Sequence, residues 1–174
     1  MTISVGRDGS YAVLGLKGDF RGGGESFTEL RRRGHEALAE SPFLGLDLGR
    51  VTFLDSQTLG LFVELLRSAQ GRGGEVVLFK TGERTMRWFS LSGLDRIFRI
   101  LGPGQTPGSL APAPPPEGRR ELLDSVDVER MVTELREALG DAGADGAPAA
   151  PGVPDEKTLT EIDRLLASLD EGQG

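Results

Sequence analysis

The sequence predicts an α/β protein built on a mixed β-sheet with helical crossovers. Two patterns predict this fold: two apolar runs around a turn open the chain, and strand-length apolar runs then alternate with helical periodicity. Composition sets the extent of the core. All ten aromatic residues lie between Tyr11 and Phe98, while nine of the ten prolines lie from Pro103 onward. The first hundred or so residues are therefore expected to form the folded domain, over 1–101.

Each expected element follows from a local pattern. Ile3 and Val5 alternate with polar neighbours, a turn follows at 7–10, and apolar spacing of three and four residues marks the helices. The expected elements are strands at 3–5 and 11–16, a helix at 25–40, a strand at 43–48 followed by an apolar stretch at 51–54, a helix beginning at Ser56, a strand at 76–79, a helix at 85–91 and a short strand at 97–100.

The remainder of the chain is predicted to consist of linkers and two short amphipathic helices. Residues 102–118 are rich in proline and are expected to form a stiff, extended linker outside the core. An amphipathic helix is predicted over 119–140, a flexible Gly/Ala/Pro linker over 141–154, and a second amphipathic helix over 155–171. Helices this short are marginal alone in water, so each needs a surface to pack on.

Composition excludes several functions. The chain has no cysteine and one histidine, His35, so thiolate and His-rich metal sites are excluded and a Ser-His-Asp triad is disfavoured. No combination of acid, base and nucleophile is visible. We therefore expect a protein that is not an enzyme, with no catalytic residue, metal or cofactor.

Charge and hydropathy indicate which classes of partner and which cellular location to expect. The chain carries a net charge of -7, with 14 basic and 12 acidic residues in 1–102 but 6 and 15 in 103–174. An acidic total argues against nucleic acid as a partner. No apolar run approaches the ~20 residues of a membrane span, and the N-terminus lacks the pattern of a secretory signal. A cytoplasmic protein with no membrane partner is expected.

The most informative segment is the Asp55-Ser56 pair between an apolar strand and a helix. A helix start carries unpaired backbone N–H groups and a partial positive charge. A serine there is a good cap, which is one interpretation of Ser56. The other is that its hydroxyl sits at a protruding corner, within reach of another protein's active site.

Four motifs in order resemble the STAS family, the sulfate-transporter and anti-sigma-factor-antagonist domain, over essentially 1–101. They are the strand Gly45-Leu46-Asp47-Leu48, the loop and helix Phe53-Leu54-Asp55-Ser56 with Leu59-Gly60, the entry Gly73-Gly74-Glu75-Val76-Val77-Leu78, and the closing Ser92-Gly93-Leu94-Asp95-Arg96-Ile97-Phe98. The resemblance to the anti-sigma antagonist branch implies that Ser56 is a phosphoacceptor. It also implies a kinase-like anti-sigma factor as partner, released on phosphorylation.

The same resemblance implies which residues bind the partner. They are Asp55, Gln57, Thr58, Asp19 and Arg21. Three of them depart from the family pattern: Thr58 replaces a usual glycine, Gln57 a common serine or threonine, and Arg21 a usual acidic residue. A side chain at Thr58 is expected either to crowd a docking kinase or to offer a second acceptor. We call this control of partner binding by phosphorylation of Ser56 the gate. The gate requires the Ser56 hydroxyl to face outward, and a buried hydroxyl would contradict it.

The C-terminal segment suggests an alternative function. Residues 160–166 resemble the receiver-binding peptide of a flagellar switch protein. The residues expected to dock are Leu159, Ile162, Asp163, Leu165 and Leu166. Under this alternative the chain is a non-phosphorylated scaffold or adaptor whose tail binds a receiver-domain protein. A chance match, or a helix that folds back on the domain, also fits the pattern.

Overall fold

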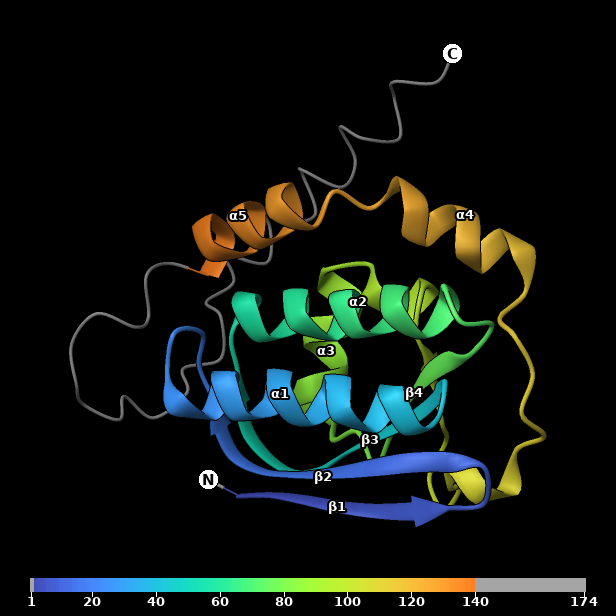
Figure 1. The fold of residues 1–174 in the computed structure, drawn as a ribbon. Helices are drawn as coiled ribbons and strands as arrows, with labels where there is room; N and C mark the ends of the chain where they lie inside the picture. Colours follow the sequence, from blue (N-terminus) through green and yellow to red (C-terminus); the bar gives the residue numbers. More distant parts are fainter. Residues whose placement is uncertain (1, 140–174) are drawn as a thin grey trace. The chain divides into compact units, whose positions relative to one another are not determined.

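Five strands form one mixed sheet in the order β1-β2-β3-β4-β5 in the computed structural model, which describes residues 2–139 (Figure 1). β1 (Thr2–Asp8) pairs antiparallel with β2 (Tyr11–Phe20). β3 (Phe43–Leu54), β4 (Glu75–Phe79) and β5 (Arg99–Ile100) continue the sheet in parallel. The predicted mixed α/β sheet is confirmed. The two apolar stretches at 43–48 and 51–54 belong to one long strand.

Helices cover one face of this sheet and enclose the main core. α1 (Glu25–Glu40), α2 (Ser56–Gln70) and α3 (Glu83–Leu91) connect the strands, and the short helix η1 (Leu94–Arg96) precedes β5. α2 lies at the centre because it is apolar on most of its circumference, as expected of a packed helix. The large, fully buried members of this core include Leu14, Leu30, Leu44, Leu46, Phe62, Phe89 and Phe98.

Part of the other face of the sheet is covered by the segment predicted to be an extended linker. Pro107 and Pro115 are buried, and Leu110 packs on the sheet against a second cluster that includes Tyr11 and Val77. The short helix η2 (Pro107–Ser109) is tied to the hairpin because Gly108 N donates a hydrogen bond of 2.8 Å to Asp8 Oδ2. This bond, with one from Thr106, holds the pKa of Asp8 below its usual value. The prediction that 102–118 lies outside the core is wrong, since this face also carries apolar residues that need cover.

Two helices follow where one was predicted. The segment expected to form a single helix over 119–140 instead forms α4 (Glu117–Ser125) and α5 (Val128–Leu139). The helix ends because Val126 is extended, and Asp127 then accepts a hydrogen bond of 3.0 Å from Arg130 N, which caps the first turn of α5. Both helices pack on the domain: Leu123 is buried in the main core, and Val126 and Met131 pack against it.

A buried polar group stabilises the second face. The Tyr11 hydroxyl donates a 2.5 Å hydrogen bond to Glu75 Oε1, and Arg99 Nη1 lies 3.3 Å from the same oxygen. Tyr11 is fully buried and Glu75 is 2% exposed. Burial, together with the bond to Glu75, raises the pKa of Tyr11 well above its ordinary 10.0.

This environment predicts an unusual alkaline titration. Because the pKa of Tyr11 is raised in the folded state, its contribution to stability is complete below pH 10 and is lost as the pH rises further. Tyr11 is the chain's one tyrosine, so phenolate absorbance reports on it alone. We expect phenolate to form above pH 10 and together with unfolding, whereas the chain in denaturant titrates near pH 10. Titration near pH 10 with an unchanged circular dichroism spectrum would contradict this expectation.

Candidate partner-binding site

The ends of β2 and β3 meet the start of α2 at one edge of the sheet. The two strands run parallel, with Asp19 opposite Phe53 and Phe20 opposite Leu54. A register irregularity between Gly18 and Asp19 precedes this end, and such irregularities redirect the side chains that follow. The edge therefore brings the loop after β2, which begins the crossover through α1, beside the start of α2.

Asp55 fixes the local geometry of this edge. Its Oδ1 accepts hydrogen bonds of 2.8 Å from both Thr58 N and Thr58 Oγ1, so it caps α2. Its Oδ2 accepts a 2.5 Å hydrogen bond from Gly22 N in the loop between β2 and α1. One carboxylate thus begins the helix and fastens the neighbouring loop.

The loop at residues 21–24 lies against Gln57 as well as Asp55. A Cβ atom added at Gly22 would overlap the Gln57 side chain, so this close approach requires glycine. Gly23 has a left-handed backbone with φ of +78°. The loop therefore contacts both residues that flank Ser56.

Exposed polar groups form the rim of the edge. Asp19 accepts a hydrogen bond from the Thr52 hydroxyl. The Arg21 guanidinium lies 4.7 Å from the centroid of the Phe53 ring, a cation–π contact that holds the arginine in place. Asp19, Arg21 and Gln57 are exposed. The rim presents both signs of charge and a half-buried aromatic ring, which are features of a surface that binds protein.

Comparison with known proteins places this fold in a family. A family model described as "Mlab, STAS domain" matches residues 3–102, which is more than half of the chain. The chain belongs to the STAS domain family. This confirms the resemblance that the four motifs carry, and that family's anti-sigma antagonists are regulatory proteins rather than enzymes.

Individual relatives agree with the family. The anti-sigma-B factor antagonists of Listeria monocytogenes and Listeria innocua are each 39% identical over 63 residues, 36% of this chain and 55% of theirs. The chain thus spans about half the length of these curated relatives. The solved structure of the anti-sigma factor antagonist SpoIIAA in its unphosphorylated form superposes with a TM-score of 0.50 at 17% identity, covering 59% of this chain and 90% of that one. It supports the same fold.

In this STAS domain the predicted phosphoacceptor is a largely covered residue. Ser56 begins α2 as expected, but it is only 8% exposed. The expectation of a protruding hydroxyl is wrong for this conformation. The residues on either side of Ser56 both contact the loop at 21–24, so this loop lies beside the start of α2.

Thr58 is also placed differently from the prediction. It is fully buried, and its hydroxyl donates to Asp55 Oδ1 at 2.8 Å, with Phe20 O as a second acceptor within reach at 3.2 Å. It therefore neither crowds a partner nor offers an accessible second acceptor. Where the family usually has glycine, this chain uses a threonine hydroxyl to join the end of β2 to the cap of α2.

The remaining predicted residues divide into two groups. Asp55 is half-buried and occupied by the bonds described above, so it acts on the site through the loop and helix. The residues Leu159, Ile162, Asp163, Leu165 and Leu166 lie outside the described part of the chain. Sequence reasoning missed Gly22 and Phe53 as parts of the site. The run Gly22-Gly23-Gly24 was the available signal for a close loop contact.

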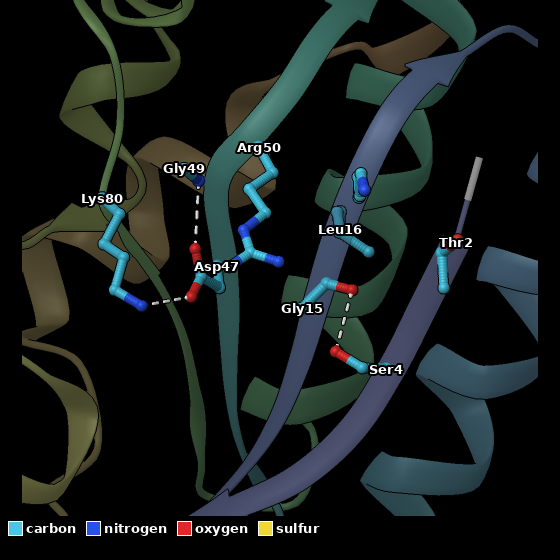
Figure 2. Close-up of a pocket in the computed structure, with 9 residues that line it drawn as sticks. Thr2, Ser4, Gly15, Leu16, Asp47, Gly49, Arg50 and Lys80 are labelled. Carbon is cyan, nitrogen blue, oxygen red and sulfur yellow. Dashed lines mark hydrogen bonds and ion pairs between the residues drawn. The ribbon is translucent and has the colours of Figure 1, made fainter.

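A separate hollow of about 670 Å³ lies on the sheet itself, away from this edge (Figure 2). Its lining comes from β1, β2, β3 and the residue after β4. Lys17, Arg50 and Lys80 contribute positive charge, and Lys80 Nζ pairs with Asp47 Oδ2 at 2.6 Å. None of the predicted site residues lines it. Within residues 2–139, no group of acidic, histidine or cysteine residues is arranged to hold a metal, and no helix is long and apolar enough to cross a membrane.

Proposed function

We propose that this STAS domain binds a kinase-type anti-sigma factor at the edge formed by β2, β3 and the start of α2. The observation that carries the proposal is the convergence of Asp19, Arg21 and Gln57 on the exposed rim around Ser56. The relatives named as anti-sigma-B factor antagonists support the class of partner. Regulation of binding by a phosphate on Ser56 is part of the proposal.

The phosphate acts through electrostatics. The kinase transfers the γ-phosphoryl group of ATP to Ser56 Oγ, the hydroxyl proton leaves, and ADP is released. The product carries about -1.5 to -2 charges. At the start of α2 the helix dipole tolerates this charge, with a stabilisation of ~0.3–1 kcal/mol. Between two docked proteins the same charge lies beside Asp55 and loses its water, so the complex is weakened while the domain remains folded.

With the loop at 21–24 in place, the burial of Ser56 contradicts regulation by direct phosphorylation, so the proposal includes a step in which this loop first opens. Because the serine is 8% exposed, the loop at 21–24 must move before a kinase reaches the hydroxyl. The bond from Gly22 N to Asp55 is the contact that this movement breaks. Three successive glycines give the loop the conformational freedom to open. A kinase that docks here and replaces the contacts of this loop with Asp55 and Gln57 would thereby expose Ser56, the residue that it phosphorylates.

A charge reversal on the rim tests the binding surface. We expect Arg21→Glu to weaken binding to a kinase-type anti-sigma factor at least about tenfold in calorimetric titration. Arg84→Glu on α3 makes the same charge change at another exposed position and is expected to leave affinity within about twofold. Equal effects of the two variants would contradict the proposed site. No binding by any chain, together with receiver-domain binding that is lost on removing 155–174, would favour the adaptor alternative.

A further inference from the structure

One side of α2 points away from the sheet and is nevertheless partly covered. The residues on this side recur at helical spacing, and they are Gln57, Gly60, Leu61, Glu64, Arg67 and Ser68. We call these six residues the outer stripe. Leu61, within the stripe, is only 2% exposed. An apolar side chain on the outer side of a helix is this deeply buried only when another element lies over it.

Phe27 of α1 lies beside this side of α2, and the segment formed by α4 and α5 covers that side (Figure 1). At the C-terminal end of α2, Arg120 Nη2 donates to Gln70 O at 3.2 Å. At the other end, Glu129 in the first turn of α5 lines the same hollow as Gln57 in the first turn of α2. The segment therefore runs back along α2, from its last turn toward the turn that carries Ser56.

Arg67 anchors the segment at its middle. Its Nη2 donates to Leu123 O at 3.1 Å and to Val126 O at 2.5 Å, two carbonyls at the C-terminal end of α4. The Leu123 side chain is 1% exposed, and Val126 and Met131 pack against the core. In the outer stripe, the Arg67 guanidinium thus binds the C-terminal end of α4, while the apolar side chains of the segment pack beside it.

The contact has the features of a reversible one. α4 has nine residues and α5 has twelve, lengths at which a helix is marginal without a packing surface. A hollow of about 560 Å³ remains along the seam between the segment and the stripe. The segment is tethered to the domain, so its effective concentration is on the order of millimolar and a weak contact suffices to hold it.

From these observations we infer that the outer stripe is a docking surface for an amphipathic helical segment, which α4–α5 occupies within the same chain. Because the stripe continues into the first turn of α2, its occupant and the proposed partner approach one region. This last consequence rests on the proposed function. Release of the segment would then strengthen partner binding. The apparent affinity is reduced when only a fraction of the chains has the segment released and can bind, so raising that fraction raises the affinity.

Adjacent leucines on α4 provide a matched pair of variants. Leu123 is 1% exposed and Leu122 is 45% exposed, so Leu123→Asp should release the segment and Leu122→Asp should not. Arg67→Gln removes the anchor from an exposed position and serves as a second releasing variant. The chain contains no cysteine, so Leu61→Cys introduces a single thiol as reporter in every variant. Thermal unfolding confirms that each variant is folded.

The rate at which dithionitrobenzoate modifies this thiol measures the cover. We expect Leu123→Asp and Arg67→Gln to raise the rate at least about tenfold, and Leu122→Asp to leave it within about twofold. A synthetic peptide of residues 117–139, added at about millimolar concentration, should slow the reaction again in Leu123→Asp. Equal rates in all variants would contradict the claim that α4–α5 covers Leu61. Lack of protection by the peptide would contradict the claim that the outer stripe is a docking surface.

The affinity for a kinase-type anti-sigma factor tests whether the segment and the partner compete. If the segment is closed nine times in ten, its release should tighten binding of a kinase-type anti-sigma factor by about tenfold. Unchanged affinity with a released segment would overturn the competition. Absence of any partner binding contradicts the proposed function, and the thiol and peptide results then judge the docking surface by themselves.

Discussion

Replacing Ser56 by aspartate is expected to weaken binding of a kinase-type anti-sigma factor roughly a thousandfold, a loss of about 4 kcal/mol. The introduced carboxylate lies at the first residue of α2, beside the Asp55 carboxylate. In the complex it meets like charge and loses its hydration, which the helix dipole offsets only by ~0.3–1 kcal/mol. Titration calorimetry against the same partner measures the change.

The domain itself should survive this substitution. Because Ser56 is 8% exposed, burying a larger polar side chain is expected to cost about 1–3 kcal/mol of stability, visible as a lowered midpoint of thermal unfolding. Ser56→Ala should bind nearly as well as the unmodified chain. Ser90→Asp, at an exposed position on α3, controls for added charge. Undiminished affinity of a folded Ser56→Asp chain would refute the gate.

Removing the Glu75 carboxylate should produce the largest loss of stability. Glu75 is 2% exposed and is the acceptor for both the Tyr11 hydroxyl and Arg99. Glu75→Ala leaves a buried hydroxyl and a half-buried guanidinium without this acceptor, and breaking such a buried pair typically costs 3–5 kcal/mol, so we expect about 3 kcal/mol or more. Urea unfolding followed by circular dichroism gives the difference.

Two comparisons make the Glu75 experiment specific. Glu40→Ala, at an exposed position, should change stability by less than about 0.5 kcal/mol. In a double-mutant cycle with Tyr11→Phe, the effects should be non-additive because the two side chains share a hydrogen bond. Additive effects, or a loss below about 1 kcal/mol for Glu75→Ala, would show that the network does not stabilise the fold.

The features that the sequence predicted well are those set by local pattern. The helix predicted over 25–40 is found at Glu25–Glu40, because the spacing of Leu30, Gly34, Ala37 and Leu38 allows one face alone to be buried. The start of α2 at Ser56 was predicted, but the cap is Asp55 and not Ser56, the residue to which the sequence assigned it. The mixed sheet follows from a hairpin placed before alternating strands and helices.

The errors concern contacts between distant segments. The surroundings of Ser56 include Gly22, a residue 34 positions earlier that contacts Asp55 and Gln57, and its approach is not encoded in the Asp55-Ser56 pair. The proline-rich linker covers the sheet because Tyr11 and Val77 leave an apolar face there, which its own composition does not reveal. The cover over α2 likewise depends on Arg67 and on the break at Asp127, which an apolar periodicity spanning 119–140 conceals.

Mapping phosphate on the chain tests the central claim most directly. The full chain and its Ser56→Ala variant are incubated with ATP and each candidate kinase-type anti-sigma factor, and the modified residue is located by mass spectrometry. We expect one phosphate, on Ser56, that is absent from the variant and whose presence dissociates the complex. Phosphate elsewhere, or none on Ser56 in a chain that binds the kinase, would contradict it.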